Sequence, residues 1–270
     1  MKASPDPIEA SGGLPGDPFD LPGGPDAALL LHGLTGSPFE LWPVARRLNA
    51  RGVRCRGPLL AGHGGDPRVL AGVGWESFVA GARRELLALE GARRTLLVGC
   101  SMGALVACAL AHELPSRVDG LALLAPAFRL RAPGALAAFL ARRTPLARLA
   151  PLWPKLGGSD VRDQAMRRAN PSMGAVPLRA VGALADLARH VEGLLPAIAA
   201  PVLLVLGGRD HTVSSAGARR AARRFGRWPC RVVELERSYH LVGIDVERER
   251  CADEVVRFFD GIPVARERRG

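Results

Sequence analysis

The sequence predicts an α/β fold with a mostly parallel central sheet flanked by helices. Short apolar runs alternate with helical segments along most of the chain. These runs are apolar on both faces, which is typical of parallel strands covered on both sides. In addition, 48% of the 270 residues are hydrophobic and 23% are charged, a balance typical of a globular chain that buries one large core. We therefore expect one domain with an inserted subdomain.

The predicted elements follow one another in a regular order from residue 26. Ser37 and Glu40 have the spacing of a capping box, and Pro38 suits the first position of a helix. A helix is therefore expected from there to Asn49. By the same reading of periodicity, strands are expected at 27–31, 52–56, 95–99, 118–124, 202–206 and 231–235, and further helices at 75–89 and 101–113.

The composition divides the chain into a leader, a core, a cap and a tail. Residues 1–25 are rich in Pro and Gly and are expected to be an irregular leader. Residues 26–127 and 201–263 form the predicted α/β core, and 264–270 a basic tail. The interval 128–200 lacks a β-branched run and is too long for a bare loop, so we predict a helical cap over the carboxyl edge of the sheet.

The basic residues do not have the pattern of a nucleic-acid interface. The formal net charge is +11, but only Lys2 and Lys155 of the 37 basic residues are lysines. Arginine pairs such as Arg83-Arg84 and Arg219-Arg220 are scattered along predicted helices and form no stripe with aromatic residues. We expect solvated helix faces and no nucleic-acid partner. The basic surface leaves room for transient contact with anionic lipid.

The five cysteines and the apolar runs indicate a cytoplasmic protein without a transmembrane segment. No cysteine pair has the spacing of a zinc or redox motif. No run of 18 apolar residues and no signal-peptide pattern occurs. A phosphate-binding loop, a dinucleotide fingerprint and a metalloprotease motif are also missing from the sequence, so no cofactor and no metal are implied. We expect a monomer or a small homo-oligomer.

A candidate nucleophile follows the run 95–98. Gly99-Cys100-Ser101-Met102-Gly103 has the pattern G-x-S-x-G and opens a helical segment rich in Ala and Leu. Strand, tight turn and helix are the context in which this pattern forms a nucleophile elbow, with the serine hydroxyl projecting from a strained turn. We predict that Ser101 is a nucleophile and that Cys100 is a small buried filler, with a redox-sensitive thiol as the alternative.

A serine nucleophile needs a base and a group that orients the base. Asp210 comes just after the apolar run 202–206, and His240 comes after the next predicted strand. Carboxyl ends of parallel strands share one edge of a sheet, so these side chains are expected near Ser101. The order Ser101, Asp210, His240 is also that of the elbow class of hydrolases.

Other histidines and acids are weaker candidates. His211 is the main rival base, but it directly follows Asp210 and would point away from it. Asp245 is expected as the N-cap of the last helix. The remaining rivals are His32 and His63 in loops, where local hydrogen bonds are expected, His112 and His190 on predicted helices, and Asp160 and Asp186 in the predicted cap.

Acyl transfer also needs donors for the negative oxygen that forms during the reaction. Backbone N–H groups can supply them without moving. In the elbow architecture they come from the residue after the nucleophile and from the loop after an early strand, which names Met102 and Leu34.

Five segments together resemble the α/β-hydrolase superfamily, and within it the small bacterial carboxylesterases and monoacylglycerol lipases. They are Leu30-Leu31-His32-Gly33-Leu34-Thr35-Gly36, Leu60-Ala61-Gly62-His63-Gly64, Gly99-Cys100-Ser101-Met102-Gly103, Gly207-Gly208-Arg209-Asp210 and Ser238-Tyr239-His240-Leu241-Val242-Gly243-Ile244-Asp245. The resemblance spans about 26–261. It implies Ser101 as nucleophile, His240 as base and then acid, Asp210 as its partner, and the Leu34 and Met102 amides as the oxyanion hole.

The chain departs from this family pattern at two positions. The family often has Pro before Gly62 and Gly before His240, where this chain has Ala61 and Tyr239. Neither departure removes a catalytic group, although both leave the shape of the loops open.

The sequence therefore predicts a serine carboxylic-ester hydrolase that works through an acyl-enzyme. The apolar cap favours a small-molecule ester with an apolar acyl group. The same scaffold also hosts lactonases, thioesterases, amidases and carbon–carbon bond hydrolases, and a catalytically silent ligand-binding protein is an alternative from another class.

Overall fold

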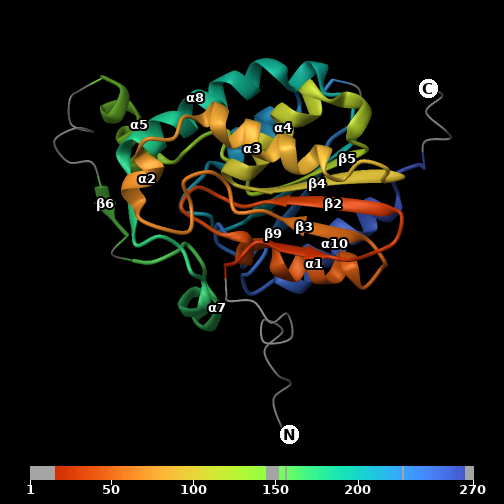
Figure 1. Cartoon of the computed structure of the whole chain (residues 1–270). Coiled ribbons are helices and arrows are strands. Elements are labelled where there is room, and N and C mark those ends of the chain that lie inside the picture. Colours follow the sequence, from red (N-terminus) through yellow and green to blue (C-terminus); the bar gives the residue numbers. More distant parts are fainter. Residues whose placement is uncertain (1–15, 144–151, 156, 227, 265–270) are drawn as a thin grey trace, which may run out of the picture.

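The computed structural model describes residues 16–143, 152–155, 157–226 and 228–264. It has a seven-stranded sheet with helices on both faces, which confirms the predicted α/β class (Figure 1). The strand order is β1-β3-β2-β4-β5-β8-β9. The strands are β1 (Phe19–Leu21), β2 (Asp26–Leu31), β3 (Arg54–Gly57), β4 (Arg94–Cys100), β5 (Gly120–Leu124), β8 (Val202–Gly207) and β9 (Arg231–Leu235).

All strand pairs of this sheet are parallel except that of β1 with β3. In the centre, β2 pairs with β4 along the full length of β2, with Leu29 opposite Leu97. The carboxyl ends of β2, β4, β5, β8 and β9 therefore lie at one edge of the sheet. Because ligands of such sheets bind beyond this edge, the loops that follow these strands are the place for a site.

Helices cover both faces of the sheet. They are α1 (Trp42–Asn49), α2 (Pro67–Ala71), α3 (Trp75–Leu87), α4 (Met102–Glu113), α5 (Ala132–Arg143), α7 (Gln164–Ala169), α8 (Leu178–Leu194), α9 (Ser215–Ala222) and α10 (Arg248–Asp260). In Figure 1, α3, α4 and α8 lie above the sheet and α1 and α10 below it.

The alternating side chains of β2 divide the core into two layers. Leu29 and Leu31 pack in the cluster that contains α3, α4 and α8, whereas Leu30 packs in the cluster that contains α1 and α10. Helix α4 is buried along nearly its whole length, as expected for a helix that is apolar on every side. Burial on both faces holds the end of β4 and the start of α4 rigidly in the middle of the molecule.

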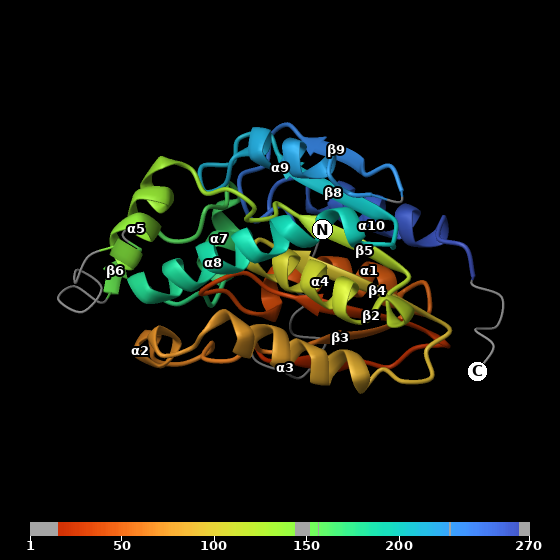
Figure 2. The same ribbon diagram turned by 90° about the horizontal axis from the view of Figure 1, so that it is seen from above.

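The interval predicted as a cap contains helices and a short second sheet. Strands β6 (Leu152–Pro154) and β7 (Ala175–Pro177) pair antiparallel, which the sequence analysis did not predict. Helix α5 packs on α8, and Ala137 and Ala138 of α5 share one buried apolar cluster with Leu178 and Val181 of α8. Both Figure 1 and Figure 2 show α2, α5 and β6 together at one end of the molecule.

Strand β1 lies inside the segment expected to be an irregular leader, so that expectation is wrong for its residues. The ring of Phe19 packs edge-on against Trp42, with centroids 4.9 Å apart, and Asp20 forms ion pairs with Arg54 and Arg56 of β3. Tertiary contacts of this kind can order a segment whose local composition favours loops. Residues 1–15 lie outside the described part of the chain.

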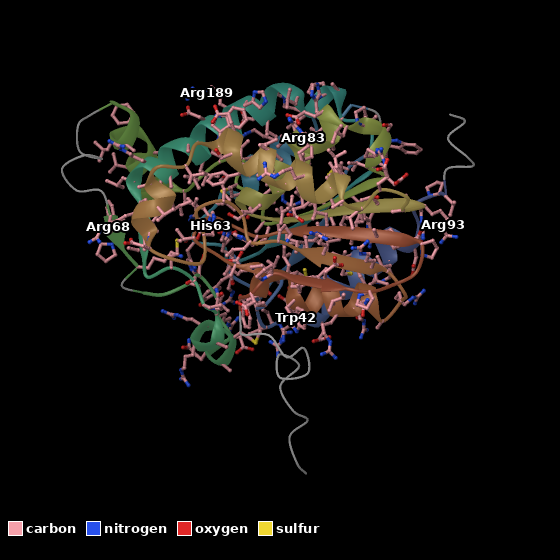
Figure 3. The ribbon with its side chains drawn as sticks, in the orientation of Figure 1. Trp42, His63, Arg68, Arg83, Arg93 and Arg189 are labelled. Carbon is pink, nitrogen blue, oxygen red and sulfur yellow. The ribbon has the colours of Figure 1, made fainter. Side chains whose placement is uncertain are left out.

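The arginines are spread over the surface, and many form ion pairs. Figure 3 shows Arg68, Arg83, Arg93 and Arg189 on separate parts of the molecule. Arg83 pairs with Glu113, and Arg93 pairs with Asp26. Within the described residues, no helix is both long enough and apolar enough to cross a membrane.

Candidate active site

Ser101 occupies a strained turn between β4 and α4. Its backbone angles are φ 52° and ψ −109°, in a region that residues with a side chain rarely adopt. A Cβ at position 99 would lie 2.4 Å from the carbonyl oxygen of Gly103, and one at position 103 would lie 1.9 Å from the carbonyl oxygen of Leu31. Only glycine fits at these two positions, so the turn is as sharp as the sequence predicts.

The structure brings Ser101, His240 and Asp210 together. The Oγ atom of Ser101 lies 2.9 Å from Nε2 of His240, and Nδ1 of His240 lies 2.8 Å from Oδ2 of Asp210. The three residues are buried, with exposed fractions of 7%, 5% and 4%. Asp210 also accepts hydrogen bonds from the backbone N–H groups of Thr212 and Val213, at 2.7 and 2.8 Å. These bonds hold its carboxylate in one orientation.

The surroundings of this pair set its protonation. Burial opposes ionisation of Asp210, but the positive charge of His240 and the hydrogen bonds from His240 and from two backbone N–H groups outweigh it, so the pKa of the carboxyl is lowered. Burial likewise opposes protonation of His240, but the charge and hydrogen bond of Asp210, with the charges of Asp160 and Glu40, raise its pKa. An ionised Asp210 can only accept, so Nδ1 of His240 carries a proton, and in the neutral ring Nε2 is the acceptor for the hydroxyl of Ser101.

Two backbone N–H groups close to Ser101, those of Leu34 and Met102, are the predicted oxyanion donors. Met102 begins α4, and N–H groups in the first turn of a helix have no acceptor within the helix. In the 32–36 loop after β2, the N–H of Gly33 donates to Glu40 and that of Thr35 to Nε2 of His63. The N–H of Leu34 between them has no hydrogen-bond partner among the described residues. A Cβ at position 33 would lie 3.3 Å from Cβ of Ser101, so this loop lies directly against the serine.

Glu40 is a functional candidate that the sequence analysis missed, because we assigned it to a capping box. That prediction is wrong: Ser37 makes no side-chain cap, and the buried carboxyl of Glu40 accepts the N–H of Gly33 at 2.9 Å. A Cβ at position 36 would lie 2.1 Å from Oε1 of Glu40. The loop therefore wraps around this carboxyl, and burial raises the pKa of Glu40 despite the hydrogen bond from Gly33.

His32 and His63 form local contacts through Nδ1, as expected, but each also accepts through Nε2 a backbone N–H that lies 28 positions away in the sequence. Nε2 of His32 accepts the N–H of Leu60 at 3.0 Å, and its Nδ1 lies 2.9 Å from the carbonyl oxygen of Gly33. Burial and the nearby His63 lower the pKa of His32 to about 3. The neutral rings thus tie the 32–36 loop to the 60–63 loop.

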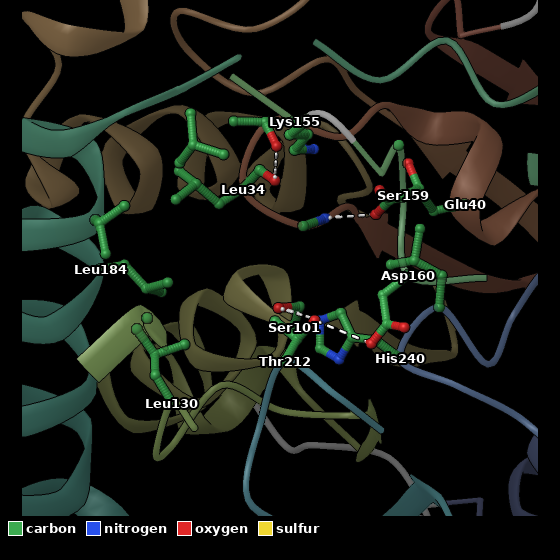
Figure 4. Close-up of a pocket in the computed structure, with 17 residues that line it drawn as sticks. Leu34, Glu40, Ser101, Leu130, Lys155, Ser159, Asp160, Leu184, Thr212 and His240 are labelled. Carbon is green, nitrogen blue, oxygen red and sulfur yellow. Dashed lines mark hydrogen bonds between the residues drawn. The ribbon is translucent and has the colours of Figure 1, made fainter. Parts of the chain in front are cut away.

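The side chains of Ser101 and His240 face a cavity of about 280 Å³, which we call the Ser101 cavity. The residues that line it are apolar on one side and polar on the other. Figure 4 shows Leu130 and Leu184 on one side of Ser101, and Ser159 and Asp160 on the other. The polar side also includes Glu40 and Lys155, whereas the apolar side includes Val176 and Val181.

The rival residues have other partners. The side chain of His211 is bound to Asp160, not to Asp210, with Nδ1 2.8 Å from Oδ1. The carboxylate of Asp245 accepts backbone N–H groups of Arg162, Asp163 and Tyr239. Its predicted role as an N-cap is wrong, because α10 begins only at Arg248. His112 lies near the end of α4, and His190 on α8 stacks on Trp75 with centroids 4.7 Å apart.

Cys100 is buried against the core and does not have the features of a redox thiol. Burial, with the charge of Glu40, raises the pKa of its thiol well above the usual range, so the reactive thiolate is disfavoured. Among the described residues, no group of three His, Cys, Asp or Glu side chains could hold a metal ion.

The chain is similar to known proteins over most of its length. The carboxylesterase of Bacillus subtilis (strain 168) is 24% identical over 247 residues, which cover 90% of this chain and 96% of the relative. The thermostable monoacylglycerol lipase of Bacillus sp. (strain H-257) is 26% identical over 245 residues, 90% of this chain and 94% of the relative.

A solved structure and a family model are also similar to this chain over most of its length. A structure from work on LipS and LipT, two metagenome-derived lipolytic enzymes, has a TM-score of 0.82 and 25% identity, and the match covers 92% of this chain and 98% of that chain. This neighbour supports the predicted α/β-hydrolase fold. The model of the family described as serine aminopeptidase matches residues 25–247. The chain therefore belongs to the serine aminopeptidase family of α/β-hydrolases.

Proposed function

We propose that this protein is a serine carboxylic-ester hydrolase in which Ser101, His240 and Asp210 form the catalytic triad. One observation carries the proposal: Oγ of Ser101 lies 2.9 Å from Nε2 of a histidine whose Nδ1 lies 2.8 Å from a buried carboxylate. This geometry lets a base remove the hydroxyl proton while a third group orients the base.

In the first half of the proposed reaction, Ser101 forms an ester with the acyl group of the substrate. Its Oγ attacks the carbonyl carbon while Nε2 of His240 takes the hydroxyl proton. The carbonyl oxygen becomes negative and accepts hydrogen bonds from the N–H groups of Leu34 and Met102. One such donor typically stabilises the transition state by about 3–4 kcal/mol. The tetrahedral intermediate collapses, and the departing alkoxide takes the proton from His240 and leaves as the alcohol.

In the second half, water hydrolyses the acyl-enzyme. His240 removes a proton from the water molecule, the hydroxide adds to the acyl carbon, and the same two N–H groups bind the new negative oxygen. Collapse breaks the bond to Oγ, Ser101 regains the proton from His240, and the carboxylic acid leaves. Asp210 keeps its negative charge throughout and stabilises the imidazolium that forms twice.

The lining of the Ser101 cavity supports an ester with one apolar and one polar part. Leu130, Val181 and Leu184 offer an apolar surface for the acyl chain, while Glu40 and Lys155 lie at the polar side, where an alcohol with hydrogen-bonding groups would fit. The names of the relatives, a carboxylesterase and a monoacylglycerol lipase, support the same kind of substrate. The description of the family as serine aminopeptidase makes amide hydrolysis the second candidate.

Rates on matched esters and amides test this proposal. We expect the parent protein to hydrolyse p-nitrophenyl esters from C2 to C16 and a monoacylglycerol, and to hydrolyse the p-nitroanilides of the same acyl groups much more slowly. Ser101→Ala should lower kcat by roughly 10⁴- to 10⁶-fold with an unchanged fold by circular dichroism. Faster hydrolysis of the anilides would favour the amidase, and equal ester rates for parent and Ser101→Ala would exclude Ser101 as the nucleophile.

A further inference from the structure

Three side chains next to the proposed triad form and break no bond in the reaction proposed above. Asp160 lies in the segment between β6 and α7, His211 directly follows Asp210, and Tyr239 directly precedes His240. They therefore belong to three separate parts of the chain: the cap interval, the loop of the acid and the loop of the base. Their contacts join these three parts.

Asp160 binds both loops at once. Its carboxylate accepts the backbone N–H of His211 at 3.0 Å and the hydroxyl of Thr212 at 3.1 Å, and it lies 2.8 Å from Nδ1 of His211. Its backbone carbonyl oxygen accepts the N–H groups of His240 and Leu241, at 3.1 and 3.2 Å. Figure 4 shows Asp160 beside His240, with the bond to Thr212 drawn.

His211 and Tyr239 add a second connection between the loops. Their rings meet edge to face with centroids 4.5 Å apart and an interplanar angle of 84°. The backbone of Tyr239 is itself fixed, because its N–H donates to the buried Asp245 at 2.6 Å. His211 thus binds Asp160 through Nδ1 and contacts the residue before the base through its ring. A glycine at position 239 could not make this contact.

We propose that Asp160, His211 and Tyr239 form a clamp that holds the loop of Asp210 and the loop of His240 at their working distance. The three are positioning residues for the reaction proposed above, so this inference rests on the proposed function. The bond between His240 and Asp210 joins two loops that leave different strands. The clamp supplies a second tie between these loops and anchors both to the cap interval.

The clamp also acts on His240 through the negative charge of Asp160. The acidic side chains that act on His240 are Asp210, Asp160 and Glu40, and all three raise its pKa. Lys155, which lines the same cavity, lowers the pKa of Glu40. Removal of the charge at position 160 should therefore move the acid limb of the pH–rate profile to lower pH. Loss of the mechanical tie should lower kcat itself, so the two contributions can be measured separately.

Variants at position 160 with a matched control at position 163 test the clamp. Asp163 lies in the same segment, but its carboxylate caps α7 and pairs with Arg248, away from the triad. With a p-nitrophenyl ester, Asp160→Ala should lower kcat by about 10- to 100-fold, since small misplacements of reacting groups cost this much, and change KM less. Asp160→Asn keeps one acceptor oxygen and should lose less kcat, yet move the acid limb as far as the alanine variant. Asp163→Ala should retain the parent kcat and pH profile.

Aromatic variants at position 239 test the ring contact. Tyr239→Phe keeps the contact with His211 and should match the parent, whereas Tyr239→Ala should lower kcat. If the clamp acts as one unit, Asp160→Ala combined with His211→Ala should lose less kcat than the product of the two single losses.

Three outcomes would overturn the clamp. In the first, both Asp160 variants have the same kcat as Asp163→Ala. In the second, the Asp160 variants shift the acid limb but lose no kcat. In the third, Tyr239→Phe and Tyr239→Ala have equal rates. Each leaves the proposed function intact if the parent still hydrolyses esters. A parent without ester hydrolysis would instead contradict the proposed function.

Discussion

At the residue scale, the site depends on one neutral histidine held between an acceptor and a donor. Asp210 is ionised and fixes the proton of His240 on Nδ1, so that Nε2 faces the hydroxyl of Ser101. The same carboxylate raises the pKa of His240, although burial opposes this. A serine hydroxyl can be activated only by the neutral imidazole. Activity should therefore be lost as the pH falls through a value above the ordinary histidine pKa of about 6.5.

Asp210→Asn tests this coupling. Without the carboxylate, the pKa of His240 should fall, so the acid limb of kcat/KM should move to lower pH. At the same time kcat should drop by about 10⁴-fold, because the imidazole is no longer held in the required tautomer. Initial rates from pH 4 to 9 for the parent and the variant measure both effects. An acid limb that stays in place would show that Asp210 does not act on the titrating base.

At the scale of single elements, the 32–36 loop after β2 is held by three side chains. Glu40 accepts the N–H of Gly33, His63 accepts that of Thr35, and His32 contacts the carbonyl oxygen of Gly33. The residues on both sides of Leu34 are thereby held in place, and we propose that the Leu34 amide binds the negative oxygen of the substrate. Preorganised donors of this kind do not need to move when charge develops.

Two variants of Glu40 test this support. Glu40→Ala leaves the buried N–H of Gly33 without an acceptor, which should lower the free energy of unfolding by about 1–3 kcal/mol. The amide of Leu34 should then be less well placed, so kcat should fall more than KM rises. Glu40→Gln retains an acceptor oxygen and should remain close to the parent in both respects. Thermal unfolding and ester kinetics measure the two effects, and a Glu40→Ala protein as fast as the parent would contradict this role.

Elements with strong local signals could be predicted from the sequence, and those held by distant partners could not. The elbow at Ser101 and the strands before Asp210 and His240 follow from apolar runs that end in turn residues. The hydrogen bond from Gly33 to Glu40 depends on a loop folding back over seven positions. The role of Asp245 depends on Arg162 and Asp163, which are remote in sequence. A local pattern could not distinguish these roles from helix caps.

At the scale of the whole molecule, the parallel sheet brings remote residues to one edge. Ser101, Asp210 and His240 follow β4, β8 and β9, whose carboxyl ends lie together. The apolar layers on both faces hold these strands in place. The distances between the three side chains therefore depend on the packing of the whole sheet and its helices. The cap interval completes the cavity with Lys155, Ser159 and Val181. The short β6–β7 pair of the cap interval depends on tertiary contacts, which the amino-acid composition of the two strands does not predict.

Covalent labelling of Ser101 by a fluorophosphonate tests the central claim most directly. Intact-mass measurement and peptide mapping should show one label per chain, on Ser101, in the parent protein. Ser101→Ala should show none, and His240→Ala should react far more slowly, because the hydroxyl then lacks its base. A parent protein that stays unlabelled, or that carries the label on another residue, would contradict the proposed role of Ser101 as an activated nucleophile.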